Sequence, residues 1–414
     1  MKKIKKTLGT IIFFLLSWNV MNCNALPGTS NKDTGPDTNL LLAMAVLSTG
    51  SPVQVTTLDL SESGISNSKE ILNQPEDITI GQDGLIYVAD SKNNRIVKIT
   101  SEGVVTSIAS SSGNGSTVTV INNPEGITAG PNGILYVANS GASSKTNSAY
   151  DGHNILSINT SSGNTISLLS GKDRPTSRET IDGDQGTNRF YKPEGIRYAN
   201  NKLVVAENGG FSIREVNTTS GSVTTLTGEK TTGDSTPTPG TPYNTDGPAT
   251  SARFNSPKGV VADSKGNVYI ADGKNHCIRK YDPSTGQVST FAGSKLGFSD
   301  SNASGFVDGQ GTSAKFNSLY MITIDEKDNL YVADAGNYAI RKISASGYVS
   351  TLAGGPSLNG RGDGSGSTAQ FYNPKGIYYY KNTLYITDVA KNKISGNTSL
   401  STDYSAVRKI SNVF

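Results

Sequence analysis

The sequence predicts an all-β protein in which six four-stranded blades close into a β-propeller. The segment 256–293, SPKGVVADSKGNVYIADGKNHCIRKYDPSTGQVSTFAG, holds four short apolar runs separated by Gly, Asn, Asp, Ser or Pro. Each run is too short for a helix and long enough for a strand, and the spacers allow only tight turns. This pattern recurs six times along the chain. The strand missing from the last copy is found before the first copy, which favours a closed ring.

Composition agrees with many short strands joined by turns. The 414 residues are 34% hydrophobic and include 46 Gly, and aromatic and β-branched residues recur throughout, so an intrinsically disordered chain is excluded. The formal charge is +3, but Lys2, Lys3, Lys5 and Lys6 lie in a segment that we expect to be removed. The mature chain then has 33 basic and 34 acidic residues, which gives no nucleic-acid or polybasic membrane signal.

Residues 1–22 have the pattern of a lipoprotein-type signal peptide. A lysine-rich start is followed by an apolar run and then by Val-Met-Asn-Cys, which resembles a bacterial lipobox with Asn22 in place of the usual small residue. We expect residues 23–52 to be a lipidated Cys23 and a flexible tether, and 53–414 to be the propeller. The alternatives are plain secretion with Cys23 discarded and an uncleaved anchor. The run Leu40–Leu47 fits a short helix or a buried strand.

The repeats have two anchors, an inner strand that opens with Pro-x-Gly-Ile and a second strand that ends in an acid or amide. The openings are PEDI at Pro75, PEGI at Pro124 and Pro193, PKGV at Pro257, LYMI at Leu319 and PKGI at Pro374. The second strands end at Asp90, Asn139, Glu207, Asp272, Asp334 and Asp388.

A third and a fourth strand follow each pair of anchors, except at the end of the chain. The third strand has the form RIVKI, CIRKY or AIRKI, and the fourth has the form GQVSTFAG or GYVSTLAG. The sixth unit lacks a fourth strand because the chain stops at Phe414. Gln54 to Leu60, QVTTLDL, matches the missing strand, so we expect it to complete the blade that starts at Pro374 and to remove an exposed edge.

Taken together, Pro-x-Gly-Ile, LYVAD, N-x-x-IRKI, G-x-VTTLAG and a DG-x-G-x-x-A-x-F linker resemble the NHL repeat family of β-propellers. The linker occurs at Asp182, Asp246, Asp308 and Asp363, and the resemblance covers about residues 53 to 414. It implies a six-bladed propeller. Members of this family include binding modules, scaffolds and a few enzymes, so the resemblance implies function only weakly.

The longest connecting segments all follow a second or a fourth strand, so they emerge on one face of the ring. The turns on the other face are short, such as GPNG at Gly130 and PSTG at Pro283. A ring that needed only stability would not elaborate one side, and we therefore expect the binding surface there. The alternative is that these segments are tolerated solvent insertions.

The residue after each opening Pro should lie at the mouth of the central channel on the same face. Around the ring, these residues place three carboxylates opposite two lysines, a polarised mouth that could hold a cation and an anionic group. The alternative is that they are solvated rim charges. The six residues are Glu76, Glu125, Glu194, Lys258, Tyr320 and Lys375.

An enzyme of this family would need metal ligands near the axis. Propeller lactonases and amidating lyases hold calcium or zinc with carboxylate, Asn or His ligands. The only histidines, His153 and His276, fall in or near third strands, which excludes a His-rich zinc site, and the three glutamates leave a calcium site open. We expect no cofactor.

Three further motifs have structural explanations. The tripeptide Arg361-Gly362-Asp363 could engage an integrin, but its Asp and the following Gly belong to the repeated linker. Four third strands share an arginine, which we expect to pair with the acid that ends the second strand and so to join the blades. Cys277 aligns with Ala339, which indicates a small packed residue without an activating dyad.

The leading functional hypothesis is a cell-envelope lipoprotein, anchored at the outer membrane or cell surface through its lipid, with a monomeric, non-enzymatic propeller. It would bind a protein or glycan through the long-loop face. The alternative is a calcium-dependent hydrolase or lactonase at the channel mouth. Aromatic residues expected to supply affinity on that face are Tyr150, Tyr243, Phe298, Phe306 and Tyr404.

Overall fold

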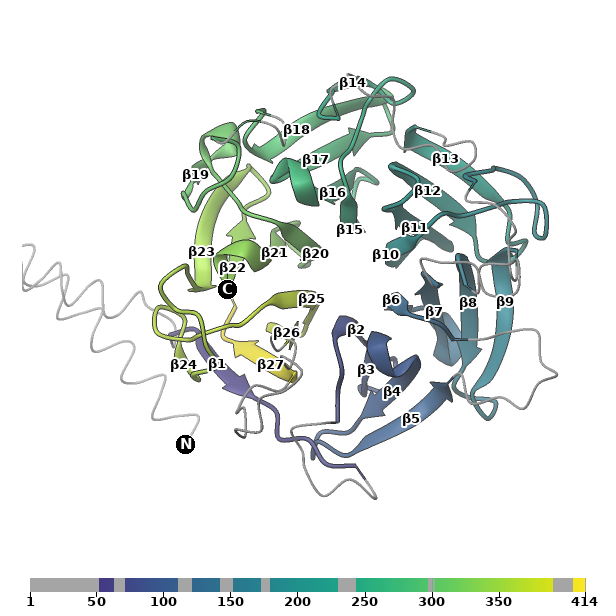
Figure 1. The fold of residues 1–414 in the computed structure, drawn as a ribbon, viewed down its shortest axis with the longest axis horizontal. Coiled ribbons are helices and arrows are strands. Elements are labelled where there is room, and N and C mark those ends of the chain that lie inside the picture. Colours follow the sequence, from purple (N-terminus) through teal and green to yellow (C-terminus); the bar gives the residue numbers. More distant parts are fainter. Residues whose placement is uncertain are drawn as a thin grey trace, which may run out of the picture. The chain divides into compact units, whose positions relative to one another are not determined.

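Six antiparallel sheets surround a central axis in the computed structural model (Figure 1). It describes residues 52–62, 71–110, 121–141, 152–172, 179–229, 243–296, 300, 302–389 and 405–413. All of them belong to one compact unit, residues 51–414. The signal peptide, Cys23, the tether and the run Leu40–Leu47 lie outside the described residues. The prediction of an all-β six-bladed propeller is confirmed.

The blades follow one another along the chain, and each runs from an inner strand at the axis to an outer strand. Blade 1 is β2 (Pro75–Ile80), β3 (Ile86–Asp90), β4 (Arg95–Ile99) and β5 (Val105–Ser110). Blade 2 is β6 (Pro124–Ala129), β7 (Ile134–Asn139), β8 (Asn154–Asn159) and β9 (Thr165–Gly171). Blade 3 is β10 (Pro193–Ala199), β11 (Lys202–Glu207), β12 (Ser212–Asn217) and β13 (Val223–Gly228).

The other three blades carry a short fifth strand at their outer edge. Blade 4 is β15 (Pro257–Ala262), β16 (Val268–Asp272), β17 (Cys277–Asp282) and β18 (Gln287–Gly293), with β14 (Gly247–Pro248) outside. Blade 5 is β20 (Leu319–Ile324), β21 (Leu330–Asp334), β22 (Ala339–Ile343) and β23 (Tyr348–Gly354), with β19 (Gly309–Gln310) outside. Blade 6 is β25 (Pro374–Tyr380), β26 (Thr383–Asp388), β27 (Ala406–Ser411) and β1 (Gln54–Thr57), with β24 (Gly364–Ser365) outside.

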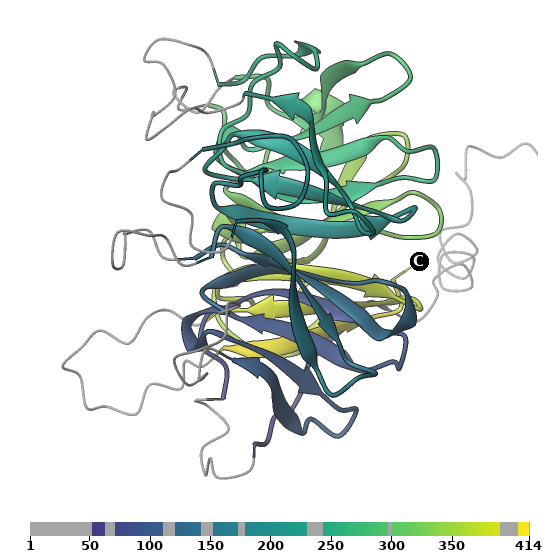
Figure 2. The same ribbon diagram turned by 90° about the vertical axis from the view of Figure 1, so that its right-hand side faces the viewer.

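The core is divided among the joints between blades. Six clusters of buried apolar side chains each draw on two neighbouring blades, such as Tyr87 of blade 1 with Ile127 and Leu135 of blade 2. Second strands such as β3 are buried along their whole length because they lie between two neighbouring sheets. In the side view the tight turns that join first to second and third to fourth strands lie on one face (Figure 2).

The Gly of Pro-x-Gly-Ile is required by the close approach of neighbouring inner strands. A Cβ atom on Gly126 would lie 2.0 Å from the carbonyl oxygen of Glu194 in the next blade, and one on Gly195 would lie 2.2 Å from that of Lys258. Real Cβ atoms do not approach backbone so closely. The motif therefore sets the diameter of the ring.

The ring closes as predicted, through the N-terminal strand. Gln54–Thr57 pairs antiparallel with β27, from Gln54 opposite Ser411 to Thr57 opposite Arg408. Val55 is only 1% exposed and packs in the core between blades 5 and 6. Farther on, Ser61 bridges to Val104, immediately before β5, so the same segment also ties blade 6 to blade 1.

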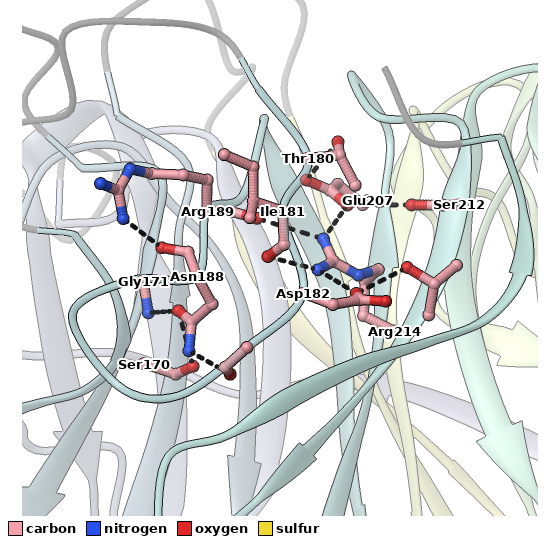
Figure 3. A network of polar contacts seen from close by, with 12 residues as sticks. Ser170, Gly171, Thr180, Ile181, Asp182, Asn188, Arg189, Glu207, Ser212 and Arg214 are labelled. Carbon is pink, nitrogen blue, oxygen red and sulfur yellow. Dashed lines mark hydrogen bonds and ion pairs between the residues drawn. The ribbon is translucent and has the colours of Figure 1, made fainter. Parts of the chain in front are cut away.

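The linkers that precede blades 3 to 6 are each fastened by the arginine of the following third strand. In blade 3, Arg214 donates to Glu207 at 2.7 Å and to Asp182 of the linker at 2.8 Å (Figure 3). Phe190 of the linker packs against the guanidinium, whose carbon lies 5.2 Å from the ring centroid. Asp182 also accepts from the Thr225 hydroxyl of the fourth strand. The predicted pairing with the acid is confirmed, and the partner that joins neighbouring blades is the linker aspartate. The same clamp occurs at Arg279, Arg341 and Arg408.

Blades 1 and 2 satisfy the polar residue that ends the second strand in other ways. In blade 1, Arg95, two residues before the usual position, donates to Asp90 and to Glu62 at 2.7 Å each. In blade 2 the acid becomes Asn139, which donates to Asn154 at 3.0 Å. The alignment of the six repeats in the sequence found no such arginine in blade 1. It missed Arg95 because it placed the arginine at the same position of every third strand.

The tripeptide at Arg361 is used internally. The Asp363 carboxylate accepts from the backbone N–H of Thr57 at 2.9 Å, from the Thr57 hydroxyl at 2.8 Å and from Arg408 at 3.0 Å. This aspartate therefore clamps the closing strand β1, which agrees with its place in the repeated linker.

The fifth strands were not expected from the sequence. The linkers that precede blades 4, 5 and 6 each pair two residues with the outer strand, for example Gly247 with Val288. They cover edges that would otherwise expose unpaired backbone groups. No helix among the described residues has both the length and the apolar character to cross a bilayer.

Candidate functional site

The predicted mouth residues occupy the second position of the six inner strands. Because all six strands run in the same sense along the axis, these side chains form one ring around the channel. The ring consists of Glu76 in β2, Glu125 in β6, Glu194 in β10, Lys258 in β15, Tyr320 in β20 and Lys375 in β25.

The ring residues bind one another. Lys258 pairs with Glu194 of the preceding blade at 2.6 Å, and Lys375 pairs with Glu76 of the following blade. The ammonium groups of both lysines also lie over the ring of Tyr320, 5.0 and 4.9 Å from its centroid. The structure thus brings all of these predicted residues together, with pairs between adjacent blades in place of a separation across the channel.

Most of these charges are buried, so they are not solvated rim groups. Glu76 and Glu194 are each 6% exposed and Lys375 is 8% exposed. Burying an isolated charge is costly, and pairing each with an opposite charge offsets that cost. Although burial opposes protonation, the pKa values of Lys258 and Lys375 are raised by Glu194 and Glu76 respectively, which keeps both lysines charged.

Glu125 is the ring carboxylate that has no lysine beside it. Burial, followed by the negative charges of Glu194 and Glu76, raises its pKa to about 8, while the two lysines act in the opposite direction. Asn123 donates to its carboxyl oxygen at 2.6 Å. At neutral pH Glu125 mostly holds a proton, and the ring as a whole carries almost no net charge.

A cleft of about 480 Å³ opens beside Glu125, on the face predicted to bind. It is bounded by the segments that follow the second strands of blades 1 and 2 and by those that precede the inner strands of blades 2 and 3. Its walls carry hydroxyl, amide, ammonium and carboxyl groups. The lining residues are Ser91, Lys92, Asn94, Asn122, Asn123, Glu125, Ser140, Gly141, Lys192 and Glu194.

Local structure fixes the walls of this cleft. After β3, the chain makes one turn of 3-10 helix, η2 (Ser91–Asn93), which ends at Asn94 with a positive φ of 49°. The Ser91 hydroxyl donates to the carbonyl of Pro124, and the side-chain oxygen of Asn94 accepts from the Asn123 N–H at 2.8 Å. These bonds join blade 1 to blade 2, so the cleft is held by backbone and short side chains.

Arg197 and Asp77 form a buried ion pair that the sequence comparison missed. The guanidinium of Arg197 donates to both oxygens of Asp77, at 2.7 and 3.1 Å, and to the carbonyls of Ile127 and Ile377. One arginine thus joins the inner strands of blades 1, 2, 3 and 6. The sequence did contain a sign of an unusual role for Asp77, because this residue stands where four other units have the Gly of Pro-x-Gly.

Two of the five predicted aromatic residues are described. Tyr243 is half-buried against Phe211, with ring centroids 6.1 Å apart, and Phe306 is 37% exposed with its ring 4.7 Å from the guanidinium carbon of Arg341. Phe306 therefore packs on the clamp of blade 5, and Tyr243 packs on an aromatic side chain of blade 3. The other three, Tyr150, Phe298 and Tyr404, lie outside the described residues.

The histidines and the cysteine show no catalytic arrangement. His153 is buried beside Tyr191, and His276 accepts the Ser318 N–H at 2.9 Å, so each packs next to a third strand as expected. Cys277 is fully buried, and burial raises the pKa of its thiol, which makes it a poor nucleophile. In the part of the chain that the structure describes, no three His, Cys, Asp or Glu residues gather to hold a metal ion.

The sequence matches the family model of the NHL repeat at residues 72–99 and 254–281, which lie in blades 1 and 4. The chain is an NHL-repeat β-propeller. NHL repeat-containing protein 2 of Bos taurus is 32% identical over 161 residues, 37% of this propeller chain and 21% of that protein. SUPPRESSOR OF QUENCHING 1 of Arabidopsis thaliana is 29% identical over 168 residues, 38% of this chain and 14% of that protein. The aligned region thus spans about a fifth or less of these relatives.

Solved structures agree with the fold of this NHL propeller. An auxiliary nutrient binding protein from Bacteroides ovatus superposes with a TM-score of 0.56 at 17% identity, over 87% of this chain and 76% of that chain. At this identity the likeness establishes the fold alone.

Proposed function

We propose that this NHL propeller is a non-enzymatic binding protein of the cell envelope that captures a protein or glycan partner through the face around the channel mouth. The observation that carries the proposal is the polar cleft of about 480 Å³ beside Glu125. Its walls offer hydrogen-bond donors and acceptors in fixed positions, as a polar ligand requires. The fold likeness to a protein described as nutrient binding supports the same class of function.

A calcium-dependent hydrolase or lactonase receives less support from the geometry. Of the three glutamates at the mouth, Glu76 and Glu194 are already committed to Lys375 and Lys258. A cation there would have to compete with two ammonium groups that contact the same carboxylates. Metal analysis of the purified protein, and melting with and without chelator, test this alternative. Bound calcium would revive it.

The decisive experiment for partner binding is cross-linked capture by the full-length protein and by charge variants of one face. Lys92 is exposed on the lip of the cleft, so Lys92→Glu should weaken capture severalfold, since it inverts a charge next to the ligand. Lys265→Glu is the matched control, because Lys265 is also exposed and lies on the short turn between β15 and β16 of the other face.

The outcomes separate the hypotheses. Loss of capture with Lys92→Glu and retention with Lys265→Glu support the proposal. Equal capture by both variants would show that the partner binds elsewhere. If the unmodified protein captures nothing, a structural role in the envelope is favoured instead.

Anchoring is a separate proposal. We infer from the lipobox-like sequence that Cys23 is lipidated and holds the propeller at the outer membrane or the cell surface. Cys23→Ala should then release the protein from membranes and abolish labelling by radioactive palmitate. Retention of the variant in the membrane fraction would contradict lipid anchoring.

A further inference from the structure

A second hollow lies on the opposite face of the propeller, between blades 1 and 2. Its volume is about 610 Å³, and its walls come from the turn after β2, the end of β6 with the turn after it, and the turn between β8 and β9. These are the short turns, far along the strands from the channel mouth. Residues that contribute polar groups are Gln82, Asp83, Lys98, Asn132, Thr160, Ser161 and Asn164.

A small side chain contributes to the hollow at this joint, although blade 4 also has an alanine, Ala262, at the equivalent position. Ala129, at the end of β6, lines it. The equivalent residues in blades 3 and 6 are Tyr198 and Tyr379, whose rings stack on Tyr136 and Tyr331 of the preceding blades. The stacked centroids are 6.0 and 5.9 Å apart, with rings parallel to within 4°. Where those joints hold a tyrosine ring, the joint between blades 1 and 2 holds empty space.

A second difference also keeps this joint open. Between blades 4 and 5, the hydroxyl and N–H of Ser264 donate to Asp328 at 2.7 and 3.1 Å and so close the groove. The matching residues here are Gln82 and Gly133, and Gly133 has no side chain that could accept such a bond. Gly81 likewise stands where blade 4 has Asp263, whose carboxylate folds back over its own turn.

The chemical groups that line the hollow indicate the class of ligand that it would bind. Amide, hydroxyl and ammonium groups provide donors and acceptors, while Ile134, Leu135 and Ala129 add a modest apolar share. Charge is balanced between Asp83 and Lys98, and the Asp83 carboxylate already accepts from the Tyr87 hydroxyl at 2.7 Å. Neither a cation nor an anion is therefore favoured over a neutral molecule rich in hydroxyl groups.

We propose that this hollow is a second binding site, which takes one ring of a neutral sugar in the space that a tyrosine ring fills at the sibling joints. The sugar's hydroxyl groups would bond to the turn side chains, and its C–H face would lie on the apolar wall. This site is independent of the partner face around Glu125 and does not rest on the function proposed there.

The fold itself supplies the test variant. Ala129→Tyr introduces the residue that blades 3 and 6 carry, where the hydroxyls of Tyr198 and Tyr379 donate to Asn201 and Asn382, three residues on. Blade 2 has Asn132 three residues after Ala129, in a turn that is one residue longer than those of blades 3 and 6, so the new ring should be accommodated and should fill the hollow. Lys98→Met is a second variant that removes a donor and keeps the shape of the side chain.

The experiment is ligand-observed NMR of the full-length protein with glucose, galactose, mannose and N-acetylglucosamine, each added singly. At least one sugar should show saturation transfer with millimolar affinity, and both variants should weaken it tenfold or more. Lys265→Glu, on the same face but in the turn between β15 and β16 of blade 4, should leave it unchanged. Absence of transfer for all four sugars would overturn the proposal, as would undiminished binding by a folded Ala129→Tyr protein. If that variant fails to fold, undiminished binding by Lys98→Met overturns it.

Discussion

Removal of one clamp arginine should destabilise the propeller strongly, and Arg341 offers the cleanest case. Its side chain and that of Asp334 are fully buried and joined at 2.8 Å. Arg341→Leu would leave Asp334 with only the donors of Asn317 and Asn337. Removing one partner of a buried ion pair costs about 3–5 kcal/mol, because the remaining charge is left uncompensated.

The loss of folding stability caused by Arg341→Leu should grow with pH. Burial, partly offset by Arg341, already holds the pKa of Asp334 at about 6. Without the arginine, the folded-state pKa rises further above the unfolded value, so the folded protein binds more protons than the unfolded chain over a wider range. Stability then falls as pH rises through that range. The variant should therefore lie closer to the parent at pH 5 than at pH 8.

Blade 2 indicates a second substitution that should restore the stability lost in Arg341→Leu. There the acid is Asn139 and the arginine position is Leu156, and both are buried. Arg341→Leu combined with Asp334→Asn reproduces this neutral arrangement and should recover most of the loss. The linker partner Asp308 is 43% exposed at its side chain and stays solvated in either variant.

Urea unfolding followed by far-UV circular dichroism measures these differences, since the only tryptophan lies in the predicted signal peptide. Lys202→Met is the control, because the Lys202–Glu215 pair is partly exposed and such pairs contribute about 0.2–1 kcal/mol. A loss below about 1 kcal/mol for Arg341→Leu, or a double variant no more stable than the single one, would refute the reasoning.

Three further outcomes are expected. Glu125→Gln should stabilise the protein increasingly as pH rises from about 4.5 to 8, because the raised pKa of Glu125 makes its ionisation unfavourable in the folded state. Thermal unfolding midpoints of both proteins at pH 5 and pH 8 check this. An equal difference between the midpoints at the two pH values would contradict it. Val55→Asp should open the ring at blade 6 and cost about 3 kcal/mol or more, seen as rapid proteolysis of the native protein, whereas Thr56→Asp on the exposed face should not. The Cys277 thiol should resist dithionitrobenzoate until the chain unfolds, and fast labelling of native protein would argue against its burial.

The repeat pattern predicted the blades because each turn and buried run is a local feature. Six openings and six second strands define the sheets, and the orphan strand at Gln54 predicts closure, since a ring leaves no other partner for it. The fifth strands β14, β19 and β24 escaped prediction because two residues carry no periodicity. The pairing of Asp182 with Arg214 escaped it as well, because the two residues are distant in sequence and only the folded linker brings them together.

The positions of the six residues in the mouth ring could be predicted from the sequence, but their burial and ion pairing could not. Repeat register alone put Glu76 and Lys375 on the same ring, but their burial depends on how closely the inner strands approach. Ala129 aligns in the sequence with Tyr198 and Tyr379, but blade 4 has Ala262 at the same position, so the alignment alone did not indicate a hollow. The consequence of the small residue became clear only from the stacked tyrosine rings at the joints of blades 3 and 6.

The clamps and the mouth ring share one rule, that a buried charge is accompanied by its opposite or is neutralised. Asn139 and Leu156 occupy the positions at which the clamps of blades 3 to 6 have an acid and an arginine, and Glu125 takes up a proton where its neighbours have lysines. Both departures fall in blade 2. In the ring, Glu125 is therefore the group whose charge a ligand can change without breaking an ion pair. A partner that brings a cation to the cleft would release the proton of Glu125, and a neutral partner would accept a hydrogen bond from it.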